Sequence, residues 1–75
     1  MDYIVIEIQT QTTGQVATLV NAFSDKNTAE QKYHQILSAA AVSNVAIHSA
    51  SMLTSDGRQV KYESYTHIQN AEPEE

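Results

Sequence analysis

Polar and apolar residues alternate over the first ten positions of the chain. Ile4, Ile6 and Ile8 are separated by less apolar neighbours, which is the two-residue period of a half-buried strand. We therefore expect a strand over residues 2–10, with the three isoleucines facing the core.

The register of the hairpin that follows depends on the length of its turn. Gly14 lets the backbone reverse, so residues 15–23 are expected to return as a second strand. A two-residue turn places Leu19 opposite Ile8 in the core row. Because both faces of the returning strand are partly apolar, a second register stays open. In it, a three-residue loop turns the residues of the other face inward, namely Val16, Val20 and Ala22.

Residues 27–41 have the period of a helix that could cover a small sheet. Asn27 is expected to cap its start together with Glu30, three residues on. Asn44 is expected to end it in a left-handed conformation. The apolar stripe of this helix consists of Ala29, Tyr33, Ile36, Leu37 and Ala40.

A second hairpin is predicted after the helix. Residues 45–54 and 58–67 are rich in strand-forming residues and flank Asp56-Gly57, a strong two-residue turn signal. This turn pairs Ile47 with Thr66, Ser51 with Tyr62 and Leu53 with Val60, which we expect to form the core-side row. The opposite row then holds Ala46, His48, Ala50 and Met52 with His67, Tyr65, Glu63 and Lys61.

The order β-β-α-β-β predicts an α+β domain, a four-stranded and mostly antiparallel sheet with one helix on one face. Residues 1–67 are expected to form this single domain. Residues 68–75, which contain one proline and three glutamates, are expected to form an acidic flexible tail.

One helix covers only one face of such a sheet, so the other face is expected to meet another molecule. A chain of 75 residues has barely enough core to be stable alone, which favours pairing of two copies, a dimer in the first instance. The pairing is expected through the helix-free face or a strand edge. The candidate binding or interface residues are Tyr3, Val5, Val20, His48, Met52, Lys61, Tyr65 and His67.

The net charge of −5 argues against a nucleic-acid partner. Three of the nine acidic residues lie in the last four positions, and the four lysines and arginines are scattered along the chain. Tyr3, Tyr62 and Tyr65 could stack on bases, but they lack a basic surface around them. The chain has no cysteine, and its apolar runs are too short to span a bilayer, so neither disulfides nor a membrane partner are expected.

The candidate chemistry is sparse. His48, His67 and Glu63 are expected on one side of the second hairpin, but their spacing matches no established zinc signature, so neither a metal nor a cofactor is predicted. No serine lies in a nucleophile elbow, and both glycines are used in turns, so we expect no enzyme.

The segments MDYIVIEIQT and SDKNTAEQKYHQIL resemble small uncharacterised proteins encoded by bacteriophages and prophages of Firmicutes. The resemblance implies a bacterial cytoplasm and a small structural or assembly component. It also implies an alternative, a host-directed binding module that inhibits a protein or sequesters a small anionic ligand. The residues for that alternative are Tyr65, His48, Lys61 and His67.

Overall fold

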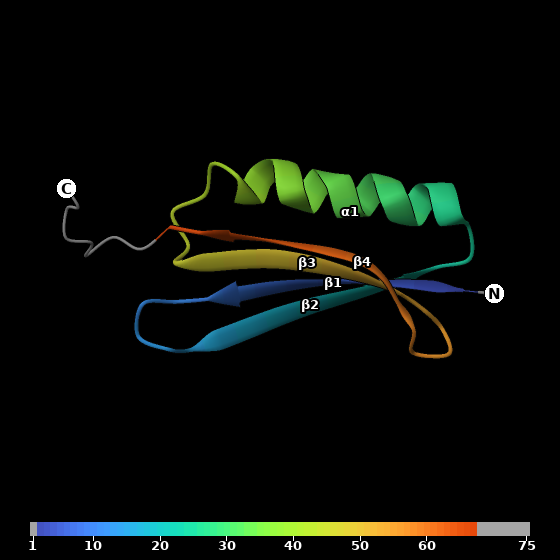
Figure 1. Ribbon diagram of the computed structural model, residues 1–75, viewed down its shortest axis with the longest axis horizontal. Helices are drawn as coiled ribbons and strands as arrows, with labels where there is room; N and C mark the ends of the chain where they lie inside the picture. Colours follow the sequence, from blue (N-terminus) through green and yellow to red (C-terminus); the bar gives the residue numbers. More distant parts are fainter. Residues whose placement is uncertain (1, 68–75) are drawn as a thin grey trace.

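The computed structural model describes residues 2–67, which form one antiparallel sheet with one helix lying along it (Figure 1). The sheet order is β2-β1-β3-β4, and every neighbouring pair is antiparallel. This confirms the predicted α+β class and adds the strand order. The predicted tail, residues 68–75, lies outside the described residues. The elements are β1 (Tyr3–Thr10), β2 (Val16–Phe23), α1 (Lys26–Ala40), β3 (Ile47–Thr54) and β4 (Gln59–Thr66).

The cap of the helix is Asp25, two residues before the predicted cap Asn27. Asp25 has an extended backbone, and its carboxylate accepts hydrogen bonds from the backbone N–H of Thr28 at 2.9 Å and from its hydroxyl at 2.8 Å. A carboxylate at this end also interacts favourably with the positive pole of the helix dipole. The predicted capping box with Glu30 is wrong, because that carboxylate binds Lys61 of β4 instead, at 3.1 Å.

The helix ends without a left-handed residue. Ala41 is right-handed, and its N–H donates to the carbonyl of Leu37 at 2.9 Å. Among the residues described, positive φ occurs only at the two glycines, so the predicted role of Asn44 is wrong.

Both hairpins turn through a three-residue loop that ends in a glycine. In the first, the N–H of Gln11 donates to the carbonyl of Gln15, and the N–H of Gly14 donates to the carbonyl of Gln11. The second repeats this pattern at Thr54, Arg58 and Gly57. Both glycines have φ of 93°, a value that other residues rarely adopt. Of the two registers left open for the first hairpin, the structure takes the three-residue one, which pairs Ile6 with Val20.

The second hairpin keeps the predicted pairing from Ile47 to Met52 although its turn is one residue longer than predicted. A bulge between Met52 and Leu53 compensates, because it leaves Leu53 opposite Gln59 and takes Val60 out of the ladder. The predicted Leu53–Val60 pair is therefore wrong.

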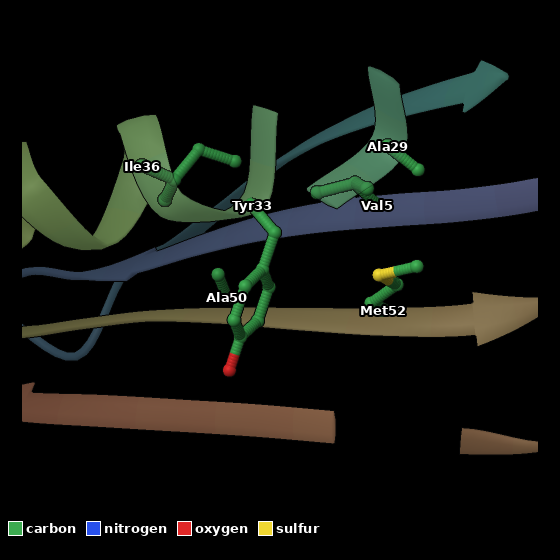
Figure 2. Close-up of a cluster of buried hydrophobic side chains, with 6 residues drawn as sticks. All are labelled: Val5, Ala29, Tyr33, Ile36, Ala50 and Met52. Carbon is green, nitrogen blue, oxygen red and sulfur yellow. The ribbon is translucent and has the colours of Figure 1, made fainter. Parts of the chain in front are cut away.

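The core lies between the helix and the two central strands (Figure 2). Of the predicted helix stripe, Leu37 is partly buried and the other four residues are buried. Tyr33 reaches down from α1 across β3, with its hydroxyl pointing toward β4. The buried cluster consists of Val5, Ala29, Tyr33, Ile36, Ala50 and Met52.

The predicted orientation of the sheet is wrong. Val5 and Met52 are fully buried beneath the helix, so alternation along β1 turns Ile4, Ile6 and Ile8 to the helix-free face. The helix buries Tyr33 and Ile36 as well as two alanines, and Ala50 on β3 leaves room for these large side chains between the two layers. A row of isoleucines would hold the layers farther apart, which explains why the bulkier row faces away.

Candidate functional site

The helix-free face of the sheet carries no charged residue at any of its strand positions. Four residues from each strand form it, and cross-strand pairing assigns them to one side. Its seven polar residues are six serines and threonines and Gln59, which pairs with Leu53 and whose amide donates to the hydroxyl of Ser51 at 2.9 Å. Nine positions are apolar, namely Ile4, Ile6, Ile8, Val16, Val20, Ala22, Ile47, Leu53 and Tyr62.

This face holds most of the large apolar side chains that the described chain exposes. Seven such residues are exposed, and four of them, Val16, Val20, Ile47 and Tyr62, lie here, while Val60 lies in the bulge of β4. Tyr62 is 64% exposed and Val20 is 61% exposed. Scattered surface hydrophobes need no explanation, but a continuous uncharged patch is typical of an interaction surface. We define the sixteen residues of this side as the uncharged face.

Seven of the eight sequence-nominated interface residues lie on the other side of the sheet, so their predicted placement is wrong. Val5, Met52 and His48 are buried under the helix and do not meet solvent. Lys61, Tyr65, Tyr3 and His67 are partly buried on the helix side or at its margin. Val20 alone of the eight lies on the uncharged face.

A hydrogen-bonded network of polar side chains lies on the helix-covered side of the sheet, near the end of α1. Nε2 of His48 lies 2.6 Å from Oε2 of Glu7, and its Nδ1 lies 3.0 Å from the hydroxyl of Ser43. The amide of Gln9 donates to the same Glu7 oxygen at 3.0 Å. The His48 ring is buried, with 4% of the residue exposed. The loop after the helix is thus joined to β3 and β1.

The protonation of this network of side chains follows from which of its groups can donate a hydrogen bond. A carboxylate of Glu7 only accepts, so Nε2 of His48 carries a proton, and in the neutral ring Nδ1 accepts from the Ser43 hydroxyl. Carboxylate, imidazole and hydroxyl in a row resemble the order found in hydrolase triads. Here, however, the buried ring is packed inside the fold, and the Ser43 oxygen also accepts from the N–H of Val45 at 3.3 Å. These contacts fit a brace within the structure.

Sequence reasoning missed this hydrogen-bonded network because Glu7 lies 41 residues from His48 in the sequence. The signal was present in the strand pattern: Ala46, His48, Ala50 and Met52 alternate with bulkier or hydroxylated residues. Small residues at that period mark the side that a helix approaches closely. A histidine in such a row is expected to be buried and hydrogen-bonded.

A second polar contact lies over β4. Nζ of Lys61 binds Glu30 at 3.1 Å and lies 5.6 Å from the centre of the Tyr33 ring. Burial raises the pKa of the Tyr33 hydroxyl, and the nearby carboxylates of Glu63 and Glu30 raise it further. Glu30 also lies 3.6 Å from Nε2 of His34, one helical turn further along α1. These contacts hold the polar side of the helix to the sheet.

The stability of the brace is expected to depend on pH through Glu7. Burial alone would raise the pKa of this carboxyl, but hydrogen bonds from His48 and Gln9 and the charges of His48 and Lys32 outweigh it and lower the pKa. A carboxyl with a lowered pKa stabilises the fold above its ordinary pKa and loses that contribution as acid protonates the folded form.

We therefore expect the difference in unfolding free energy between the wild type and Glu7→Gln to shrink between roughly pH 5 and pH 3. Urea unfolding at several pH values measures it. A difference that stays constant over this range would show that Glu7 does not titrate as the contacts require.

Within residues 2–67, no group of three or more histidine, aspartate or glutamate side chains is arranged to hold a metal ion. The helix of this region is too short and too polar to cross a membrane. Comparison of the chain with models of protein families, with curated proteins and with solved structures found no match.

Proposed function

We propose that this chain is a small non-enzymatic interaction or structural protein that self-associates through its uncharged face. The observation that carries the proposal is the placement of Ile4, Ile6 and Ile8 together with exposed Val20 and Tyr62 on a face without charge. The chain's own helix lies on the opposite side, so only another molecule can bury these side chains. Work in the cytoplasm of a bacterial host, as a component of phage type, is part of the same proposal.

Charge favours a second copy of the chain as the molecule that covers the uncharged face. Each copy carries a net charge of −5, so two copies repel each other on average when their charged surfaces meet. Contact between two uncharged faces brings none of them into the interface. A two-fold interface also places the same patch on both sides, which suits a surface of apolar and hydroxyl groups.

The size of the uncharged face also supports a second copy of the chain as its partner. Four strands of eight residues cover roughly 26 by 19 Å, or about 500 Å² in projection. Two such faces stacked together approach the ~1,000 Å² in total that a specific interface requires. Sheets that pack face to face interdigitate side chains in this way about 10 Å apart.

The alternative of a binding module for a small anionic ligand finds less support in the geometry. His48 is buried against Glu7, and Lys61 is engaged with Glu30. The cationic groups nominated for such a ligand are therefore already occupied within the fold.

Solution mass, measured by size-exclusion chromatography with light scattering over a range of concentrations, tests the proposal. The wild type is expected to elute as a multiple of 8.3 kDa. Tyr62→Glu is expected to weaken association by more than ~100-fold, because it buries an unpaired carboxylate between the two sheets. Val42→Glu is the matched control, since it adds the same charge at a loop residue that is 85% exposed.

Two results would contradict the proposal. One is a wild type with the mass of a single chain at all concentrations. The other is a Tyr62→Glu variant that keeps the mass of the Val42→Glu control.

A further inference from the structure

We propose that β2 pairs edge to edge with β2 of a second copy, so that two chains form one continuous eight-stranded sheet. The inference rests on the proposed function and adds a second contact to it. It concerns different groups of the molecule, because it uses the outward backbone N–H and C=O groups of β2 rather than the side chains of the uncharged face. The observation behind it is that β2 lacks the devices by which exposed edge strands normally avoid pairing.

The two edges of the sheet differ in this respect. Edge strands are usually protected by charged residues, proline or a bulge. The sequence of β2, VATLVNAF, has neither a charge nor a proline, and its pairing with β1 has no bulge. The other edge strand, β4, carries Lys61 and Glu63 and is bulged next to Val60.

Side-chain exposure agrees with an unpaired β2. All of its residues are exposed except Phe23, which is partly buried. Leu19 is 59% exposed although it lies on the helix side of the sheet, where the helix does not reach over it. An exposed leucine on that side is not explained by stacking of the uncharged faces, but a strand laid beside β2 would cover it.

Backbone geometry identifies the groups available for pairing. The bond from the N–H of Gln11 to the carbonyl of Gln15 makes these two residues a hydrogen-bonded pair. Bonded and non-bonded pairs alternate along an antiparallel ladder, so the odd-numbered residues of β2 bond to β1. The N–H and C=O groups that point outward are those of the even-numbered residues Val16, Thr18, Val20 and Ala22.

A two-fold axis at Leu19 uses all of these outward groups. It pairs Thr18 with Val20 of the other copy and Val16 with Ala22, and every such pair joins two outward-facing residues. The two Leu19 side chains then lie opposite each other. No charged residue faces a like charge in this register, because β2 contains none.

Such pairing also enlarges the uncharged face. A two-fold axis perpendicular to the sheet keeps both helices on one side and joins the two uncharged faces into one surface of about 1,000 Å². Two of these dimers can then stack face to face. The complete assembly is therefore a tetramer with one edge contact and one face contact for each chain.

Thr18→Pro is the variant that tests the edge contact. Proline removes an outward N–H without removing a bond to β1, which is the position where edge strands tolerate it. Ser64→Pro is the matched control, because Ser64 is an exposed hydroxyl residue with an outward N–H on β4. Both residues lie on the uncharged face, so the two prolines affect the face contact alike, and we expect Thr18→Pro to give half the solution mass of Ser64→Pro.

Hydrogen exchange in the wild type tests the same contact without any substitution, which matters if Thr18→Pro does not fold. The outward amides of Thr18 and Val20 are expected to exchange at least ~100-fold more slowly than those of Tyr62 and Ser64 at the other edge. Equal exchange at the two edges, or a mass lowered by Ser64→Pro instead, would overturn the edge contact.

The outcomes separate this inference from the proposed function. If Tyr62→Glu lowers the mass but Thr18→Pro does not, the face contact stands and the edge contact is wrong. If Thr18→Pro lowers the mass but Tyr62→Glu does not, the edge contact stands and the face contact is wrong. A wild type that has the mass of a single chain at all concentrations would contradict both the face contact and the edge contact.

Discussion

Val5→Glu is expected to leave the chain unfolded, whereas Val20→Glu is expected to leave it folded but dissociated. Val5 is fully buried beneath the helix in contact with the central cluster. A carboxylate there has no partner, and burying it costs several kcal/mol. A domain of this length has roughly 4–11 kcal/mol of stability in total. The substitution therefore removes most or all of it.

Val20 offers a closely matched comparison. It is the same residue type, also in a strand, but it is 61% exposed on the uncharged face. A glutamate at this position stays hydrated in the single chain, so the unfolding free energy is expected to change by less than about 1 kcal/mol. In the assembly the same carboxylate is desolvated, so association is expected to weaken strongly.

Circular dichroism during thermal unfolding and light scattering after chromatography distinguish the two effects. Val5→Glu is expected to lose its secondary structure, and Val20→Glu is expected to keep it at a reduced mass. A folded Val5→Glu with its mass unchanged would mean that the core is not where the structure places it. A Val20→Glu that assembles like the wild type would argue against the uncharged face as an interface.

His48→Ala is expected to cost about 3 kcal/mol of unfolding free energy. The substitution removes the hydrogen bonds to Glu7 and Ser43 at once and opens a cavity beside the end of α1. It also leaves the partly buried Glu7 carboxylate without its strongest partner, and breaking a buried pair in this way costs about 3–5 kcal/mol in fully enclosed sites. The remaining hydrogen bond from Gln9 reduces the loss.

His34→Ala is the control for the loss of a histidine as such. Its side chain is 65% exposed, and it lies 3.6 Å from Glu30 on the outer side of the helix. An exposed pair of this kind contributes about 0.5 kcal/mol or less. Urea unfolding of both variants at neutral pH gives the comparison. Equal destabilisation of the two variants would show that the Glu7–His48–Ser43 chain is not a brace.

Local sequence signals were sufficient to predict the elements of this fold. Two-residue periodicity predicted β1, and helical periodicity predicted the buried stripe from Ala29 to Ala40. Gly14 and Gly57 marked both turns. These signals are local because strand and helix periods and turn conformations depend on neighbouring residues. The cap was mistaken because Asp25, Asn27 and Thr28 are all acceptable capping residues within four positions.

Local signals were not sufficient to predict the candidate site. The brace joins Glu7 to His48, 41 residues away, and no spacing rule connects two strands whose order is unknown. The position of the uncharged face was also mistaken, since both sides of β1 and β3 carry apolar residues. The seven nominated residues were assigned to the wrong side together, because reversing a sheet moves every strand residue to the other face.

By itself, the sequence determined the elements, their order along the chain and the pairing of the second hairpin from Ile47 to Met52. Each of these depends on periods and turns that extend over a few residues. Only the tertiary structure decided which side of the sheet the helix covers and where β2 lies at the edge. The physical reason is packing. Tyr33 and Ile36 of α1 pack in one buried cluster with Ala50 of β3, where a row of isoleucines would leave less room, and that choice leaves the bulky apolar row for another molecule to cover.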